Sequence, residues 1–391
     1  MTFSARMPAE LAPNRLSAAI AAMQRASRPY LDLTLSNPTR AGFTYDPQLL
    51  APLAHPRGLA YAPEPLGLRA ARQAVAEEFL RQRIDVSPDR IALTASTSDA
   101  YSLLFKLLCN PGDDVLVPRP SYPLFDHLTR LDGVTAVGYD LEYHGRWSID
   151  CASVRRAITP RTKALLLVSP NNPTGNIVSR EELDEVDAVC AAHNIAMIAD
   201  EVFADYVIDA EAGERAGHLF GRHALGFTLG GLSKSVGLPQ LKLGWIALSG
   251  PEPIVSAAQA RLEFACDTYL SVATPVQAAA RDILTLGVSV RRQIEARIVA
   301  NYHRLEALAG AAPATTLLRA EGGWYAVLQV PTFRSEEDLA LHLLTEHGVL
   351  AHPGYFFDFS HESFLILSLL TPEADFEEGV RRILSVVPFP H

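Results

Sequence analysis

Short runs of branched and leucine side chains recur along the first two thirds of the chain, separated by longer amphipathic stretches. These runs have the length of β-strands and cover residues 91–95, 114–118, 136–141, 163–169, 195–200, 226–232 and 243–249. Several of the intervening stretches, such as 100–108 and 180–193, have the apolar spacing of a helix. Strands that alternate with helices predict an α/β fold, in which a mostly parallel sheet is wrapped by helices.

The last two runs, 226–232 and 243–249, have no helix pattern between them. A parallel pair needs a long crossover, so we expect one of these runs to be an antiparallel member of the sheet. The seven runs together predict a seven-stranded sheet.

The remainder of the chain has a different pattern. Residues 256–308 are helical in character, and strands and helices mix again from residue 320 onward. The clearest amphipathic helices in this last part cover residues 336–346 and 372–384. We expect a large domain over residues 45–280 and a smaller α+β domain formed by residues 1–44 and 281–391.

Composition narrows the classes of protein to consider. The chain has 391 residues and a formal charge of −10, which argues against nucleic acid as a partner because no basic stripe is present to meet phosphates. Its four cysteines are widely spaced and predict no zinc site, and they are typical of buried thiols in a reducing compartment. No run approaches the length of a membrane span and no targeting segment is visible. We therefore expect a cytoplasmic protein that acts on small molecules, with no membrane partner and no bound metal.

Three polar stretches follow predicted strands in the order and at the intervals that pyridoxal 5′-phosphate chemistry needs. They are N-N-P-T-G at 171–175, D-E at 200–201 and S-K-S at 233–235. Such chemistry requires a lysine that forms a Schiff base with the cofactor, a buried carboxylate that keeps the pyridine nitrogen protonated, and donors for the remaining oxygens. Lys234, Asp200 and Asn172 are the candidates. Asn172 and Lys234 follow predicted strands and Asp200 ends one, and ligands of such sheets bind at the carboxyl ends of the strands.

Lysine is scarce in this chain, which adds weight to Lys234. Only four of the thirty-four basic residues are lysines, at positions 106, 163, 234 and 242. A solvated lysine in a loop is the ordinary alternative for Lys234, and the surrounding motif makes that alternative weak.

A phosphate site is predicted where the strand at 91–95 leads into the helix at 100–108. Ser96, Thr97 and Ser98 place hydroxyls at the first turn of that helix, where free amides and the helix dipole favour an anion. A plain helix cap explains the same residues. Ser233 and Lys242, on either side of the Schiff-base lysine, add a second set of donors and favour the phosphate interpretation.

Taken together, these motifs resemble the class I/II aminotransferases, the fold type I enzymes that use pyridoxal phosphate. The resemblance extends from about residue 35 to residue 384, and its motifs are N-P-x-G at 172–175, D-E at 200–201, S-x-S-K-x-x-G at 231–237 with Gly231 at the first serine, and P-x-Y at 120–122. It implies that Asn172 contacts the phenolic oxygen of the cofactor and that Tyr122 stacks on its ring. It also implies a homodimer, in which Tyr61 reaches the phosphate of the neighbouring subunit.

The reaction implied by the resemblance moves an amino group from an amino donor to a keto acceptor. Lys234 would form the Schiff base and then act as the base that moves the proton between substrate and cofactor. Asp200 would keep the pyridine ring charged, which makes the ring an electron sink.

The sequence departs from the family at three positions. Phe203 stands where a tyrosine is usual, which removes one donor to the phenolic oxygen, and Lys242 stands where an arginine is usual in the phosphate site. Ile366 stands where the family has the arginine that binds the substrate carboxylate. Either another arginine replaces it, or the substrate amine has no carboxylate at that place.

Arg40 is our first candidate for the replacement and Arg119, beside the stacking tyrosine, is the second. Arg40 and Asn37 lie in the segment S-N-P-T-R that aligns with the part of the family that closes over substrate. Trp324 lies in a stretch that borders the substrate in the family, so we also expect it to contact substrate, although a structural core explains it equally well.

Two other classes of function remain open from the sequence. One is a lyase, decarboxylase or amine transaminase that uses the same cofactor on a substrate without the usual carboxylate contact. The other is a non-catalytic relative that retains the cofactor site as a binding module. The intact set of Asn172, Asp200 and Lys234 argues against the second of these.

Overall fold

The structure is a computed structural model that describes residues 3–8, 10–61, 63–331 and 333–387. Its strands are β1 (Leu31–Asp32), β2 (Ile91–Thr94), β3 (Asp114–Arg119), β4 (Thr135–Tyr143), β5 (Trp147–Ile149), β6 (Thr162–Val168), β7 (Ala196–Asp200), β8 (Gly226–Gly231), β9 (Gly244–Ser249), β10 (Thr316–Leu318), β11 (Tyr325–Gln329), β12 (Val349–Leu350), β13 (His352–Pro353) and β14 (Phe364–Ser368). Its α-helices are α1 (Arg15–Arg25), α2 (Arg69–Arg81), α3 (Thr97–Leu108), α4 (Phe125–Leu131), α5 (Cys151–Ala157), α6 (Arg180–His193), α7 (Ala210–Arg215), α8 (Leu232–Ser235), α9 (Glu252–Tyr269), α10 (Thr274–Ala278), α11 (Ala280–Leu286), α12 (Val288–Gly310), α13 (Glu336–His347) and α14 (Glu373–Val386). Short 3-10 helices are η1 (Pro38–Arg40), η2 (Pro47–Ala54), η3 (Pro56–Leu59), η4 (Pro88–Arg90), η5 (Pro239–Leu241) and η6 (Gly354–Phe357).

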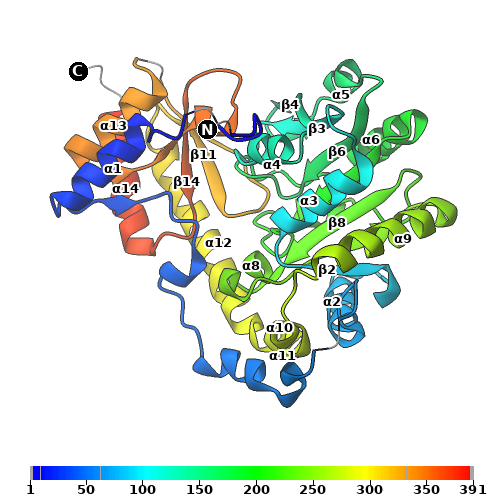
Figure 1. The fold of residues 1–391 in the computed structure, drawn as a ribbon. Helices are drawn as coiled ribbons and strands as arrows, with labels where there is room; N and C mark the ends of the chain where they lie inside the picture. The colour runs from blue at the N-terminus through cyan, green and yellow to red at the C-terminus, as the bar shows by residue number, and fades with distance from the viewer. Residues whose placement is uncertain (1–2, 9, 62, 332, 388–391) are drawn as a thin grey trace.

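The largest sheet has eight strands in the order β2-β9-β8-β7-β6-β3-β4-β5 (Figure 1). Each of the seven predicted runs overlaps one of its strands, and the expected antiparallel member is β9, which pairs antiparallel with both β2 and β8. The strands β3, β4, β6, β7 and β8 pair in parallel. The eighth strand, β5, was not predicted, because a run of three residues at the sheet edge is too short to give a periodic pattern.

Both faces of this sheet are covered, which explains why its central strands β6, β7 and β8 are buried along nearly their whole length. In β6 the side chains alternate: Leu166 packs into a cluster with α3 and α9, and Leu165 packs into the core that includes α2 and α6. The cofactor site can therefore form only at the ends of the strands, where the backbone leaves the core.

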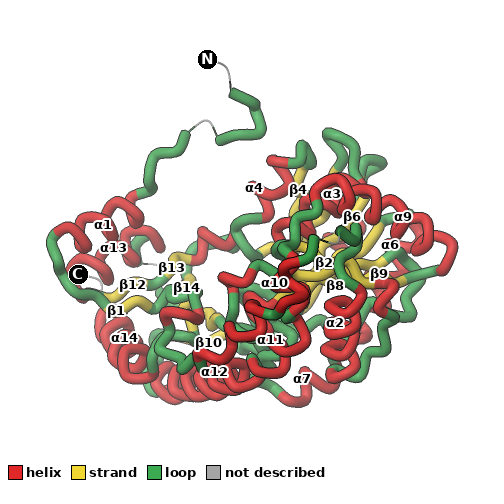
Figure 2. Tube along the Cα trace, turned by 60° about the horizontal axis from the view of Figure 1, so that its bottom comes forward, coloured by secondary structure: helices red, strands yellow, loops and turns green. Residues whose placement is uncertain are grey.

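A second sheet of four antiparallel strands has the order β10-β11-β14-β13. Beside it, β1 from the start of the chain pairs with β12 from its last third. Figure 2 shows α1, α13 and α14 gathered around these short strands, at the opposite end of the molecule from α3, α6 and α9. The N-terminal and C-terminal segments thus pack together, and the division into domains at residues 45 and 281 stays a prediction.

The helices predicted near the C-terminus are confirmed, with small differences at their ends. The patterns at 336–346 and 372–384 correspond to α13 and α14. In the part of the chain that the structure describes, no helix has both the length and the apolarity needed to cross a membrane.

Candidate active site

Three neighbouring strands bring the predicted chemistry to one place. Asn172 follows β6, Asp200 is the last residue of β7, and Lys234 lies in α8, directly after β8. Because these strands are adjacent and parallel, their carboxyl ends meet at one edge of the sheet. A cavity of about 160 Å³ lies there. The predicted residues in its lining are Ser96, Thr97, Tyr122, Asn172, Asp200, Ser233 and Lys234.

Asp200 is held in a fixed orientation by two donors. Its side chain accepts hydrogen bonds from the Tyr101 hydroxyl at 2.9 Å and from the Val202 backbone N–H at 3.1 Å. Only 8% of the residue is exposed, and this burial raises the pKa of its carboxyl while the two hydrogen bonds and the Lys234 charge lower it in part. A cation that faces such a buried carboxylate from the cavity would stabilise its charged form.

Lys234 points its amine into the cavity between aromatic rings. The Nζ atom is 4.6 Å from the centre of the Trp324 ring and 5.6 Å from that of Phe203. Burial lowers the pKa of Lys234 from 10.5 to about 8, and the negative charge of Asp200 partly opposes this shift. An amine with such a pKa exchanges protons readily near neutral pH.

The backbone around the cavity leaves room for a ligand and presents donors to it. Ser96 caps α3, and its hydroxyl accepts from the Asp99 N–H at 3.1 Å, so the amides of the first helical turn face outward at this end. A Cβ atom at Gly244 would lie 2.9 Å from Thr94 Oγ1 and 3.1 Å from the Ser96 carbonyl carbon, so any side chain there would crowd this end of the cavity. The helix N-terminus and the hydroxyls beside it suit an anion.

Three of the predicted cofactor-binding residues lie outside the cavity lining. Ser98 is one residue further along α3 than the lining residue Thr97. Lys242 is exposed and ends η5 in the left-handed conformation, with φ of 51°. Tyr61 is 78% exposed.

The predicted substrate-binding residues are also spread out. Arg40 is an exposed residue of η1, and Asn37 caps that turn by accepting from the Thr39 N–H at 3.0 Å. Arg119 lies across Gly138 and lines a different cavity, of about 830 Å³. Ile366 is fully buried in β14, opposite Val327.

Tyr101 was not expected from the sequence, whereas Ser36 and Tyr325 belong to the two segments for which the family resemblance implies contact with substrate. Ser36 and Tyr325 line the cavity from the N-terminal segment and from β11, and Tyr101 holds Asp200 from behind. A signal existed for Tyr101, since a tyrosine on the apolar side of a helix needs a partner for its hydroxyl. For Ser36 and Tyr325 the signal was the resemblance of their segments to the family, and which side chains of those segments face the cavity depends on how the second sheet packs.

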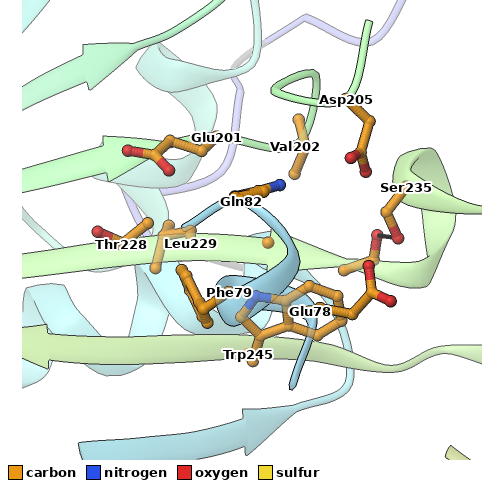
Figure 3. Close-up of a pocket in the computed structure, with 12 residues that line it drawn as sticks. Glu78, Phe79, Gln82, Glu201, Val202, Asp205, Thr228, Leu229, Ser235 and Trp245 are labelled. Atoms are coloured by element: carbon orange, nitrogen blue, oxygen red, sulfur yellow. Dashed lines mark hydrogen bonds between the residues drawn. The ribbon is translucent and has the colours of Figure 1, made fainter. Parts of the chain in front are cut away.

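A second, smaller cavity of about 30 Å³ lies next to the first and shares Val202 and Gly231 with it. Figure 3 shows Glu201 and Thr228 on one side of this cavity and Glu78, Asp205 and Ser235 on the other. Burial and the neighbouring Asp200 raise the pKa of Glu201 to about 8. The surroundings of Glu201 thus favour its neutral form.

An ion-pair network at the edge of this small cavity holds the segment that contains Lys234. The Arg291 guanidinium donates to the Ser235 carbonyl at 2.7 Å and to Glu78 at 2.8 Å, and it lies 3.4 Å from Asp205. Arg81 forms a further ion pair with Asp205. These contacts connect α2, α12 and the loop after β7 to the residue next to Lys234, so the position of the lysine is fixed from several elements.

Comparison with known proteins agrees with this geometry. The family described as aminotransferase class I and II matches residues 45–383. The chain belongs to the class I and II aminotransferases. Among its relatives is the glutamate-pyruvate aminotransferase AlaA of Escherichia coli K12, which is 27% identical over 86% of this chain and 85% of its own length. The alanine aminotransferase of Mycobacterium tuberculosis H37Rv is 28% identical over 90% of this chain and 84% of its own.

Solved aminotransferases have the same fold. The alanine aminotransferase from Pyrococcus furiosus superposes with a TM-score of 0.87 at 24% identity, and covers 99% of this chain and 100% of its own. A double mutant of the Thermus thermophilus aspartate aminotransferase gives 0.81 at 25% identity, with the same coverage. The protein is thus a fold type I aminotransferase, and its relatives favour transamination over lyase or decarboxylase chemistry.

Aminotransferases of this family use pyridoxal 5′-phosphate, and the residues present here fit it. An amine, a buried carboxylate and a helix N-terminus face one cavity, as an aldehyde, a pyridine nitrogen and a phosphate require. The side-chain oxygen of Asn172 is buried without a partner, which leaves a polar group for a ligand to satisfy.

Proposed function

We propose that Lys234 is the residue that binds pyridoxal 5′-phosphate covalently and transfers the proton during transamination. The observation that carries this proposal is the convergence of Asn172, Asp200 and Lys234 on one cavity from three adjacent strands. When bound, the cofactor supplies an aldehyde for the amine and a ring that accepts electrons from the substrate carbon. The chain supplies the base, the counter-charge and the positioning.

Each of these residues has a task that its surroundings support. Lys234, with a pKa of about 8, takes and returns a proton near neutral pH. Asp200, fixed by Tyr101 and Val202, places a negative charge where the pyridine nitrogen would carry its proton. Asn172 lines the cavity, where its amide N–H would donate to the phenolic oxygen, and Tyr122 has a ring at the cavity wall for stacking.

The phosphate would lie at the N-terminus of α3, with Ser96, Thr97, Ser98, Ser233 and Lys242 as its donors. We also propose a cytoplasmic homodimer in which Tyr61 completes the site of the partner. Leu59 and Tyr61 support this proposal, because their large side chains are 91% and 78% exposed. Together they give an apolar surface that a second subunit would cover.

For the reaction itself, we propose that an amino acid is the donor and a keto acid the acceptor, as the names of the relatives indicate. A single-turnover experiment tests this. The yellow holoenzyme is mixed with alanine, glutamate, aspartate and a set of simple amines. The decrease in its visible absorbance is then followed over time. Conversion by at least one amino acid is expected, and no conversion by any amine or amino acid would contradict transamination.

Phe203→Tyr is expected to lower the midpoint of the pH titration of holoenzyme absorbance. That titration follows the proton on the nitrogen that joins Lys234 to the cofactor. A hydroxyl at position 203 would donate to the anionic phenolic oxygen and so favour loss of this proton. Tyr206 does not already provide the donor, because its hydroxyl donates to the Lys234 carbonyl at 2.5 Å. An unchanged or higher midpoint would show that another group contacts the phenolic oxygen.

Arg40→Ala is expected to weaken binding of α-amino acids by about 2 to 5 kcal/mol, the cost of leaving a desolvated carboxylate unpaired. Arg40 follows the cavity-lining Ser36 by four residues, so a movement of η1 would be needed to bring it to the substrate. Simple amines have no such charge, and their binding should be nearly unaffected.

The matched control for this variant is Arg119→Ala, which removes an exposed arginine that lines the larger cavity instead. Dissociation constants for amino acids and amines, measured by absorbance with all three proteins, separate the cases. Equal losses for both substrate types in Arg40→Ala would exclude Arg40 as the carboxylate partner, and a loss confined to α-amino acids in Arg119→Ala would assign that role to Arg119, the second candidate.

A further inference from the structure

Lys234 has aromatic rings where a buried ammonium would be expected to have hydrogen-bond acceptors. Among the residues that the structure describes, none forms a hydrogen bond with its Nζ atom, and the neighbours are the rings of Trp324 at 4.6 Å and Phe203 at 5.6 Å. A cation within about 6 Å of a ring centre is attracted by the negative face of the ring, and indole gives the strongest attraction. The rings therefore stabilise the protonated form of the amine.

Trp324 is held in this position from both sides. Its ring contacts those of Phe203 and Tyr206, with centre distances of 5.3 Å and 5.2 Å. Its carbonyl accepts from the Leu369 N–H at 2.8 Å, and the preceding Gly323 donates to the Tyr206 carbonyl at 2.8 Å. The ring is fully buried, so its place against Lys234 is determined by packing.

The indole N–H of Trp324 is buried without a hydrogen-bond partner. A buried donor without a partner lowers the free energy of unfolding, and phenylalanine would fill much of the same space without that loss. What indole offers over phenyl is a stronger π face for a cation. We propose that Trp324, with Phe203, is a positioning residue that orients the Lys234 amine into the cavity and stabilises the ammonium formed when the lysine takes up the substrate proton.

This inference rests on the proposed role of Lys234 and adds the means by which its protonation is controlled. The other groups around the amine are few. Asp200 contributes the one charge that raises its pKa, and the phenols of Tyr122, Tyr206 and Tyr325 are neutral there because burial raises the pKa of each. The rings and Asp200 therefore both oppose the lowering of the Lys234 pKa that burial causes.

The test measures the pKa of Lys234 directly, without turnover. The full-length protein, freed of cofactor by dialysis against an amine, is labelled with a trace of acetic anhydride across a pH series. Peptide mass spectrometry then gives the labelling of each of the four lysines. Trp324→Leu is expected to lower the pKa of Lys234 by about 0.4 to 1.5 units, the range of a cation–π contact. Lys106, Lys163 and Lys242 serve as internal references and should not change.

The direction of the shift decides between this role and simple packing. If Trp324 only buried the lysine, its removal would admit water and raise the pKa toward the ordinary 10.5. A rise, or no change, in Trp324→Leu would therefore overturn the proposal. Trp324→Phe keeps most of the packing and retains a weaker aromatic ring, so it should lower the pKa of Lys234 by a smaller amount. If the leucine variant does not fold, the direction of the pKa shift in Trp324→Phe decides the question.

Trp147→Leu is the matched control. Trp147 is also a buried tryptophan that lies between two rings, those of Tyr143 at 5.3 Å and Phe359 at 6.0 Å, and its indole N–H is likewise unpaired. No cation among the described residues stacks on it. The control should lose stability without any change in the pKa of Lys234, and an equal fall in the control would overturn the proposal. Lys234 is identified here by its peptide, so the result does not depend on whether it is the catalytic lysine.

Discussion

Lys234→Ala is expected to abolish transamination. Loss of a positioned general base alone lowers kcat on the order of 10² to 10⁴-fold. Loss of the amine also removes covalent attachment of the cofactor, which should then leave during dialysis against an amine. The amine faces the cavity between Asp200 and Trp324, and no other lysine is in the cavity lining of the described chain. Steady-state turnover and retention of cofactor absorbance after dialysis are the two measurements.

Lys106→Ala provides the comparison for this variant. Lys106 lies on the exposed side of α3 and pairs with Asp132, away from the cavity lining. Its removal should leave both turnover and cofactor retention unchanged. Retained steady-state activity in Lys234→Ala would show that the covalent and proton-transfer roles belong to another residue.

Asp200→Asn is expected to have the second largest effect, a fall in kcat on the order of 10² to 10³-fold, the usual cost of removing one preorganised electrostatic contact. The amide has the same shape and can still accept from the Val202 N–H, but it has no charge to keep a pyridine nitrogen protonated. The ring would then be a poorer electron sink. Rate constants from single-turnover absorbance measure this effect on the chemical step.

Tyr101→Phe separates the charge of Asp200 from its orientation. This change removes the 2.9 Å hydrogen bond to the carboxylate and keeps both the charge and the buried ring. Since that hydrogen bond lowers the pKa of Asp200, its loss should raise this pKa further. A modest fall in rate is expected, mainly toward lower pH, where more of the carboxyl becomes protonated. A similar rate for Asp200→Asn and the wild type would contradict the proposed role of the charge.

The local pattern of the chain was sufficient for the large sheet and for the residues at the ends of its strands. Apolar runs separated by amphipathic stretches require strands covered on both faces, and parallel strands place Asn172, Asp200 and Lys234 at one edge. The cap at Ser96 was likewise visible, because a hydroxyl before an apolar helix is a local signal. These features depend on periodicity and on nearby residues, which a sequence displays directly.

Contacts between distant segments were decided by the tertiary structure alone. The sequence could not show that the ring of Trp324, which directly precedes β11, lies against the Lys234 amine, or which side chains of the Ser36 and Tyr325 segments line the cavity. It also could not show that Arg119 turns to another cavity while Arg40 lies exposed on η1. Side-chain direction at such positions follows from how the two sheets and the N-terminal segment pack against each other. That packing sums many weak contacts between residues far apart in the chain, and no local pattern records it.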